Sequence, residues 1–315
     1  MIEVRHLVKT FPEVKAVDDI SFEVGNGEIF GIIGPNGAGK TTCLNILATL
    51  LQPTEGEILI DGLEIFENAR EVRRKIGYMP DFFGTYRNLT IEEYLDFYGG
   101  CCGVPLEARI KRIDEVIELT TLHDKRKELV DNLSRGMKQR LCLAKSLLHN
   151  PKLLLLDEPA SGLDPRARVE IRNILKNVAG FGTTILISSH ILSDLENICS
   201  DIAIMERGKI VKRGKIADLI KDIQPKNIWQ IEVASRTEKA LEIIKALPFL
   251  ESAAIEGKLI TVVLDGGKIA GGSENEFSGR IVQSLIQEGI GIVSFQEKKA
   301  SLEDAFMSYT KGLLA

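Results

Sequence analysis

The sequence lacks any apolar run of the about 18 to 20 residues that a membrane-spanning helix needs. Its richest apolar run, Leu153–Leu156, is followed at once by Asp157 and Glu158. The first residues alternate charged and apolar side chains, which is not the pattern of a secretory signal peptide. We therefore expect no membrane-spanning segment within this chain, and a place in the cytosol.

Cysteine is scarce, and the five cysteines form an odd set without metal-ligand spacing. The adjacent Cys101 and Cys102 would make a poor chelating pair, so we expect free, buried thiols in a reducing compartment. A strong excess of positive charge is also absent, because the formal net charge is −5. That balance gives no general attraction to nucleic acid, and we expect no nucleic-acid partner.

At 315 residues the chain is long enough for two domains. Three apolar runs, Glu28–Ile33, Lys152–Leu156 and Thr184–Ser188, are typical of strands that are buried on both faces. A helical pattern covers Ala167–Ala179, between the second and third runs. This strand-helix-strand order predicts an α/β domain over residues 1–222, with a parallel sheet whose ligand chemistry lies at the carboxyl ends of its strands.

Weaker patterns predict elements over the rest of the chain. In the first domain we expect strands at 2–7, 21–24 and 57–60, a helix at 41–51, and a helical subdomain at about 82–150 with helices at 91–98, 107–120 and 138–148. In the tail, 223–315, we expect a strand at 228–234, a helix at 237–247, a hairpin at 253–264, a helix at 276–288, a strand at 290–296 and a helix at 302–309. This βαββαβ order predicts a ferredoxin-like α+β accessory domain, in which we find no chemical motif.

A glycine-rich segment follows the first buried strand and fits the pattern G-x-x-x-x-G-K-[ST]. Its residues, with the threonine after it, are Gly34, Pro35, Asn36, Gly37, Ala38, Gly39, Lys40, Thr41 and Thr42. Such a loop curls its backbone N–H groups around phosphate oxygens, and the helix that follows adds the positive end of its dipole. Lys40 would reach the β- and γ-phosphates, and the Thr41 hydroxyl would bind Mg²⁺. Chance alone could produce the motif, but its place between a strand and a helix favours a nucleotide site.

Asp157 and Glu158 end the next buried strand, and His190 follows the third. Parallel strands bring their carboxyl ends to one edge, so these side chains are expected beside the phosphate loop. There Asp157 would lie near Mg²⁺, and Glu158 would polarise a water for in-line attack. His190 would donate to the γ-phosphate or orient Glu158. Without the phosphate loop, an Asp-Glu pair is usually a solvated turn and a lone histidine an ordinary loop residue.

These elements, together with the segment Leu133–Arg140, resemble the ATP-binding subunits of ABC transporters. The segment LSRGMKQR is similar to that family's signature loop, LSGGQ, and Ser161–Asp164 is similar to its D-loop. His190 matches the switch histidine, and Phe11 matches the aromatic residue that stacks on adenine. The resemblance covers residues 2–219.

The resemblance implies that two copies pack head to tail with ATP between them. Ser134 and Gly136 would then contact the γ-phosphate of ATP bound to the partner copy. Ser134 is placed as an N-cap, so it would direct a second helix N-terminus at phosphate. ATP binding would close the dimer and hydrolysis would open it.

The sequence departs from the family pattern in two places. The signature loop carries Arg135 where glycine is usual and Met137 where glutamine is usual. Asp81 stands where the Q-loop normally has glutamine, which contacts Mg²⁺. Asp81 would bind the metal through water or cap the next segment.

The ending Leu302–Phe306, after an accessory domain of this size, resembles the drug- and polymer-export branch, although an amphipathic helix that packs the tail would look the same. That branch implies a separate polytopic membrane subunit, with this chain as a homodimer on the inner face of the cell membrane. Two alternatives stay open. One is a soluble ABC ATPase that acts on nucleic acid or the ribosome, and the other is a nucleotide-dependent regulator that no longer hydrolyses ATP.

Overall fold

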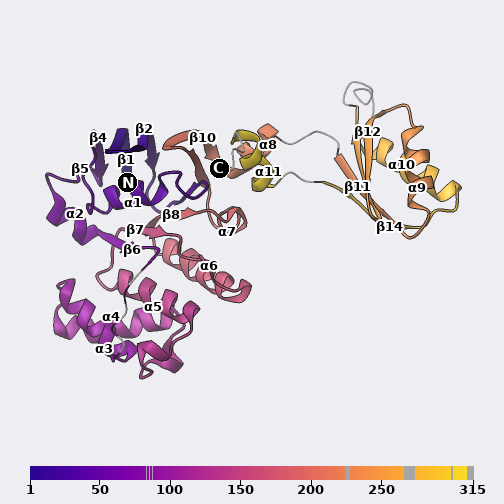
Figure 1. The fold of residues 1–315 in the computed structure, drawn as a ribbon. Helices are drawn as coiled ribbons and strands as arrows, with labels where there is room; N and C mark the ends of the chain where they lie inside the picture. The colour runs from indigo at the N-terminus through magenta and orange to yellow at the C-terminus, as the bar shows by residue number, and fades with distance from the viewer. Residues whose placement is uncertain are drawn as a thin grey trace. The chain divides into compact units, whose positions relative to one another are not determined.

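The computed structural model describes residues 1–82, 84, 86, 88–223, 228–265, 274–298 and 301–310. It contains two compact units (Figure 1). Of the described residues, one unit comprises Met1–Leu219 together with 306–310, and the other lies within Ile220–Ala305. The division falls at Leu219, whereas the sequence placed it after residue 222. The end of the last helix belongs to the first unit because it packs there. The Lys212 ammonium of that unit lies 5.0 Å from the centre of the Tyr309 ring.

A six-stranded sheet forms the centre of the first unit, in the order β10-β9-β3-β8-β7-β6. Five of these strands are parallel, and β10 pairs antiparallel with β9. The strands are β3 (Ile29–Ile33), β6 (Ile76–Met79), β7 (Leu153–Asp157), β8 (Thr184–Ser189), β9 (Asp201–Glu206) and β10 (Lys209–Lys215). Every residue of β3, β7 and β8 is buried, as the continuous apolar runs predict.

A second, antiparallel sheet of the first unit has the order β2-β1-β4-β5. Its strands are β1 (Ile2–Phe11), β2 (Val14–Val24), β4 (Glu55–Ile60) and β5 (Leu63–Glu64). The strands expected at 2–7 and 21–24 are thus parts of one long hairpin. The β1–β2 pairing shifts register three times, which breaks the period-two pattern by which a strand is recognised.

The helices of the first unit are α1 (Lys40–Leu47), α2 (Ala69–Lys75), α3 (Ile91–Cys101), α4 (Leu106–Leu119), α5 (Arg135–Leu147), α6 (Pro165–Gly180) and α7 (Leu192–Glu196). Two further helices, α8 (Ile216–Ile223) and α11 (Leu302–Tyr309), have residues in both units. In Figure 1, α3, α4 and α5 gather in one helical lobe, as expected for residues 82–150. The helix expected at 41–51 ends early, because Thr49 adopts a left-handed φ of 60°. The helix expected at 138–148 begins at Arg135, because the Ser134 hydroxyl accepts from the Met137 N–H.

The second unit has the expected βαββαβ order. Its elements are β11 (Ile228–Val233), α9 (Thr237–Lys245), β12 (Leu250–Glu256), β13 (Leu259–Leu264), α10 (Glu274–Gln287) and β14 (Ile292–Glu297). The strands form one antiparallel sheet in the order β12-β13-β11-β14. Apolar side chains of the sheet and both helices, among them Ile231, Ile260 and Ile281, make its separate core.

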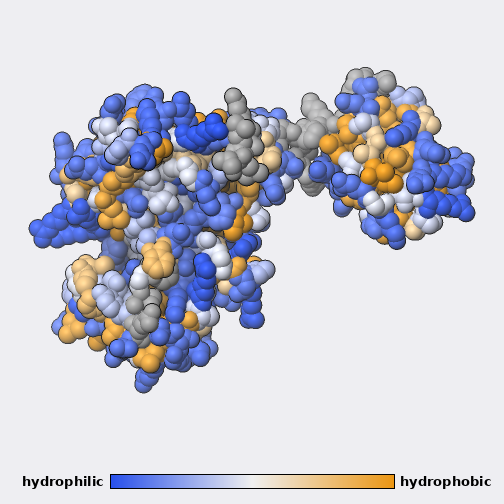
Figure 2. All heavy atoms as spheres, in the orientation of Figure 1, coloured by the Kyte–Doolittle hydropathy of each residue, from blue (hydrophilic) through white to orange (hydrophobic). Residues whose placement is uncertain are grey.

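The surface on view in Figure 2 mixes hydrophilic and apolar side chains over both units. Among the described residues, no helix has both the length and the apolar character needed to cross a membrane. All five cysteines are free. Cys43, Cys142 and Cys199 are buried as expected, but Cys101 and Cys102 are exposed, which corrects the expectation of five buried thiols.

Candidate functional site

Three parallel strands of the central sheet end at one edge, and each ending carries a predicted functional segment. The glycine-rich loop follows β3, Asp157 ends β7 with Glu158 directly after it, and His190 follows β8. A cavity of about 730 Å³ lies at this edge. The predicted site residues that line it are Phe11, Asn36, Gly37, Ala38, Gly39, Lys40, Thr41, Thr42, Asp81, Glu158 and His190. The fold therefore brings together side chains that are far apart in the sequence.

The glycine-rich loop fits tightly beneath its neighbours. Gly39 has a φ of 102°, and a Cβ there would overlap the Ala16 carbonyl. Gly34 has equally little room, because its Cβ would meet the Met205 carbonyl. Only glycine lets the backbone approach this closely. The loop then leads into α1, whose first turn carries no acidic side chain and no side-chain cap, so its N–H groups remain available to an anion.

Lys40 is buried inside the loop, with 5% of its surface exposed. Its Nζ atom donates to the Gly34 carbonyl at 2.8 Å and to the Pro35 carbonyl at 3.2 Å. It also lies 3.4 Å from Oε1 of Glu158. The ammonium is therefore held between the loop and the acidic end of β7, where an incoming phosphate would meet it.

Glu158 stands on a backbone conformation that is uncommon outside glycine, with φ at 50°. The Ser188 carbonyl of β8 accepts from the Glu158 N–H at 3.2 Å. The Glu158 carboxylate contacts His190, with Oε2 at 2.8 Å from Nδ1 of the ring. The two side chains thus form a pair at the cavity wall, and strain of this kind is typical of functional sites.

Asp157 is almost completely buried, with 1% of its surface exposed. Its Oδ1 accepts from the Ser188 hydroxyl at 2.6 Å, whereas its Oδ2 has no hydrogen-bond partner. Burial raises the pKa of the Asp157 carboxyl; the Ser188 and Thr41 hydroxyls oppose this shift, and the charges of Glu158 and Asp81 add to it. A buried carboxylate oxygen without a donor suits a cation.

The described residues contain no cluster of three or more His, Cys, Asp or Glu side chains that could hold a metal by themselves. A cation beside Asp157 would therefore need the Thr41 hydroxyl, water and oxygens of a bound anion as further ligands. Mg²⁺ is commonly bound in this way, with few protein ligands and with substrate phosphates. The residues present therefore fit Mg²⁺ that arrives with a nucleotide.

Replacing Asp157 by asparagine should make the nucleotide-free protein more stable at neutral pH. The folded-state pKa of Asp157 lies above its unfolded value, so the stability of the parent falls as pH rises through that interval. Asparagine has no charge to bury, and we expect its melting temperature to be higher at pH 7 by about 2 to 4 °C, or about 1 kcal/mol. The difference should shrink toward about pH 4, near the ordinary pKa of aspartate. Thermal melts without nucleotide or Mg²⁺ test this, and an unchanged or lower melting temperature would contradict it.

Phe11 lies at the rim of the cavity with 37% of its surface exposed, and the Lys9 ammonium lies 5.2 Å from its ring centre. The sequence motifs did not point to other residues of this wall, among them Lys15 and Arg207. Arg207 is at the tight turn between β9 and β10, with φ at 49°. No local signal marks either residue, because only the fold brings that turn next to the glycine-rich loop.

Ser134 and Gly136 do not line this cavity. Ser134 caps α5, and Gly136 packs against Ala167 of α6. The N-terminus of α5 has no acidic residue in its first turn, and Ser134 is exposed. Within one chain, the N-terminus of α5 is therefore not part of the cavity that the glycine-rich loop lines.

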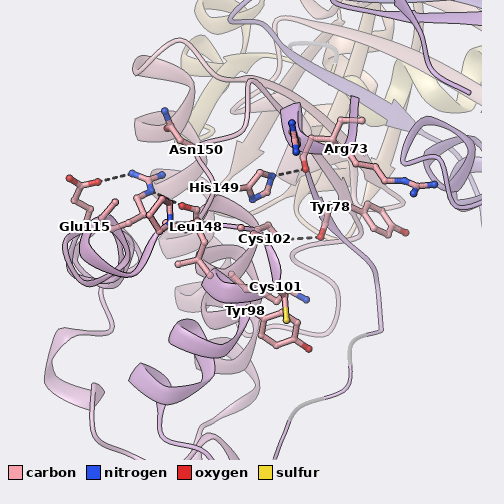
Figure 3. Close-up of a pocket in the computed structure, with 18 of the residues that line it drawn as sticks. Arg73, Tyr78, Tyr98, Cys101, Cys102, Glu115, Leu148, His149 and Asn150 are labelled. Atoms are coloured by element: carbon pink, nitrogen blue, oxygen red, sulfur yellow. Dashed lines mark hydrogen bonds and ion pairs between the residues drawn. The ribbon is translucent and has the colours of Figure 1, made fainter. Parts of the chain in front are cut away.

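A larger cavity, of about 1060 Å³, lies away from this edge, between α2 and β6 on one side and the helical lobe on the other. We call it the lobe cleft. In Figure 3, Arg73 and Tyr78 lie on one side of it and Tyr98 and Cys101 on the other. It is rich in positive charge, and its cationic lining residues are Arg70, Arg73, Arg74, Lys111, Arg112 and Lys145, beside the single carboxylate of Glu115. None of the predicted site residues lines it.

Comparison with known proteins identifies the family. Residues 17–161 match the family described as ABC transporter. The uncharacterized ABC transporter ATP-binding protein YxlF of Bacillus subtilis is 34% identical over 98% of both chains. The bacitracin transport ATP-binding protein BcrA of Bacillus licheniformis is 32% identical over 99% of this chain and 98% of its own.

A solved structure supports the same assignment. It is a dimeric ATP-binding cassette in a post-hydrolysis state, bound to ADP and Pi, with 27% identity and a TM-score of 0.63. The similarity covers 68% of this chain and 98% of that one. This confirms the predicted P-loop ABC ATPase fold. The chain belongs to the ABC transporter family, as an ATP-binding subunit that binds and hydrolyses ATP.

Proposed function

We propose that this chain is the motor subunit of an ABC exporter and works as a head-to-tail dimer that holds ATP between its two copies. The observation that carries the proposal is the arrangement at one sheet edge, where Lys40, Glu158 and His190 face a single cavity. A helix N-terminus capped by Ser134 lies elsewhere on the same chain, exposed and free of acidic side chains. Each copy thus carries two complementary halves of a phosphate site.

In this proposal the glycine-rich loop and Lys40 bind the β- and γ-phosphates, and Phe11 stacks on the adenine. Glu158 is the general base that takes a proton from the attacking water. His190 orients the Glu158 carboxylate, as their contact of 2.8 Å supports, or donates to the γ-phosphate.

Thr41 and Asp157 would hold Mg²⁺, with Asp81 acting through water. The metal would neutralise charge that develops on the β- and γ-phosphate oxygens. The orphaned Oδ2 of Asp157 supports this assignment. The negative charge of Asp81 contributes to raising the pKa of Asp157, and this supports a role for Asp81 near the same cation.

The dimer would complete each site from two chains. Ser134 and Gly136 of one copy would contact the γ-phosphate of ATP on the other. A two-fold axis then generates two equal sites. The solved cassette with ADP and Pi is itself dimeric, and this supports the same arrangement here.

The membrane part of the transporter would be a separate polytopic subunit, and this chain would lie on the cytoplasmic face of the cell membrane through that partner. BcrA, which is similar over nearly its whole length, carries bacitracin transport in its name, and this supports a transport role for this chain. The comparisons give no support to an alternative that acts on nucleic acid or the ribosome.

The lobe cleft is the surface that we assign to the membrane subunit. It is formed jointly by α2, β6 and the helical lobe, so a segment seated in it would respond when the lobe moves. Its charge is almost all positive, which favours a segment with exposed carboxylates. Within the described part of the chain, Arg70 and Arg74 have no hydrogen-bond or ion-pair partner, so their charges are available.

Recovery of the protein from its native membranes in mild detergent tests this proposal. We expect tagged Glu158→Gln protein, with ATP present, to bring a polytopic membrane protein with it in stoichiometric amount. Arg74→Glu in the same background should reduce that recovery at least about tenfold, because it reverses a charge in the cleft. Lys176→Glu, on an exposed position of α6, is the matched control and should recover the partner normally. Recovery of only ribosomes or nucleic acid would overturn the transporter proposal and leave the ATPase activity standing.

A further inference from the structure

Arg135, the first residue of α5, reaches across to the turn that follows β7. Its Nη2 atom donates to the Ser161 carbonyl at 3.2 Å. Among the described residues, this carbonyl is the one hydrogen-bond partner of the guanidinium. A side chain from the signature segment therefore touches the segment Ser161–Asp164 of the same chain.

The guanidinium also needs a glycine beneath it. Gly162 has a φ of 66°, and a Cβ there would lie 2.5 Å from Cζ of Arg135. The three atoms nearest to that Cβ all belong to the Arg135 guanidinium. Any side chain at this position would displace Arg135, so the arginine and the glycine form one fitted pair.

The turn under Arg135 is connected directly to the hydrolytic end of β7. The Glu158 carbonyl accepts from the Ser161 N–H at 3.0 Å. Ser161 also lines the nucleotide cavity together with Lys40 and Glu158. Two successive hydrogen bonds thus lead from Arg135 through Ser161 to Glu158, whose own backbone is held in a strained conformation.

We propose that Arg135 is a positioning residue for ATP hydrolysis, which fixes the turn from Glu158 to Asp164 and so keeps the Glu158 carboxylate where it can take a proton from the attacking water. This inference rests on the proposed role of Glu158 as the general base. A glycine at position 135, which the family signature usually has, offers no donor for the Ser161 carbonyl. The arginine guanidinium lies close over Gly162, and a lysine would supply a charge and a donor without the planar fork.

Steady-state ATPase kinetics with three single variants test the proposal. We expect Arg135→Ala to lower kcat about tenfold, because a small misplacement of a catalytic group is enough for such a loss. KM and the nucleotide affinity of the monomer should stay at the parental values. Arg135→Lys should recover part of kcat. Arg166→Ala is the control, because Arg166 lies at the start of α6 with 91% of its side chain exposed and, among the described side chains, forms an ion pair only with Glu170 on its own helix.

A double-mutant cycle separates positioning from a general structural defect. Gly162→Ala should lower kcat by displacing Arg135 and by straining a backbone held at a φ of 66°, so Arg135→Ala should cost less kcat in the Gly162→Ala background than in the parent. Melting temperatures of all four proteins show which part of any loss comes from reduced stability. Additive losses in kcat, or a parental kcat for Arg135→Ala, would overturn the proposal.

A last measurement distinguishes Arg135 from a residue that binds the nucleotide of the other copy. In the Glu158→Gln background, Arg135→Ala should leave ATP-driven dimer formation unchanged. Loss of the dimer would show that Arg135 acts on the partner's ATP and would overturn the positioning role. If Glu158→Gln itself hydrolysed ATP at the parental rate, the proposed function of Glu158 would fail instead, and the two failures are therefore distinct.

Discussion

Glu158→Gln should lower the ATPase kcat about a thousandfold, within the range for removal of a general base. Glutamine has nearly the same shape as glutamate and can still contact His190, which lies 2.8 Å from the carboxylate. It cannot accept a proton from water at neutral pH. The change also removes a negative charge that lies 3.4 Å from the Lys40 ammonium and faces the site of the γ-phosphate.

ATP binding should therefore survive this substitution or become tighter, because a carboxylate no longer repels the phosphate. With hydrolysis blocked, an ATP-bound dimer should accumulate and elute as such in size-exclusion chromatography with ATP and Mg²⁺. Glu107→Gln, which makes the same change on the exposed first turn of α4, should behave as the parent. Parental turnover in Glu158→Gln would mean that the general base is another group.

Lys40→Ala should weaken ATP binding at least about a hundredfold, which corresponds to about 2.7 kcal/mol. The ammonium is the cation that the fold buries inside the glycine-rich loop, and its position is fixed by the carbonyls of Gly34 and Pro35. A buried charge that meets phosphate without rearrangement contributes more than a mobile surface charge does. Titration calorimetry with ATP and Mg²⁺ measures the loss.

Two further measurements make this second prediction specific. Lys176→Ala, an exposed lysine of α6, should bind ATP as the parent does. The melting temperature of Lys40→Ala should show that it is folded, since the loss of Lys40 leaves two carbonyls without their donor. Unchanged ATP affinity in a folded Lys40→Ala protein would remove the phosphate-loop assignment.

Local sequence was sufficient for the elements whose pattern is strong. The continuous apolar runs of β3, β7 and β8 predicted strands that are buried on both faces, because a parallel sheet covered by helices leaves no polar side. The βαββαβ order of the second unit was also visible, since its helices and strands have clear periods. The long β1–β2 hairpin was not, because three register shifts interrupt its alternation.

The division into units shows a second limit. Chain order suggests that everything after residue 222 belongs to the tail, but Tyr309 packs under the Lys212 ammonium of the first unit. No local pattern encodes which unit a terminal helix joins. Contacts between residues nearly a hundred positions apart decide it.

For the candidate site, the sequence by itself determined the kinds of group present and the strand ends that carry them: a glycine-rich loop with Lys40, the pair Asp157 and Glu158, and His190. Only the tertiary structure decided how they meet. It placed Lys40 within 3.4 Å of Glu158, left one oxygen of Asp157 without a donor, and laid Arg135 on Gly162. The physical reason is that motifs report local backbone chemistry, whereas burial, charge pairing and fit between distant segments arise only when the sheet brings its strands together.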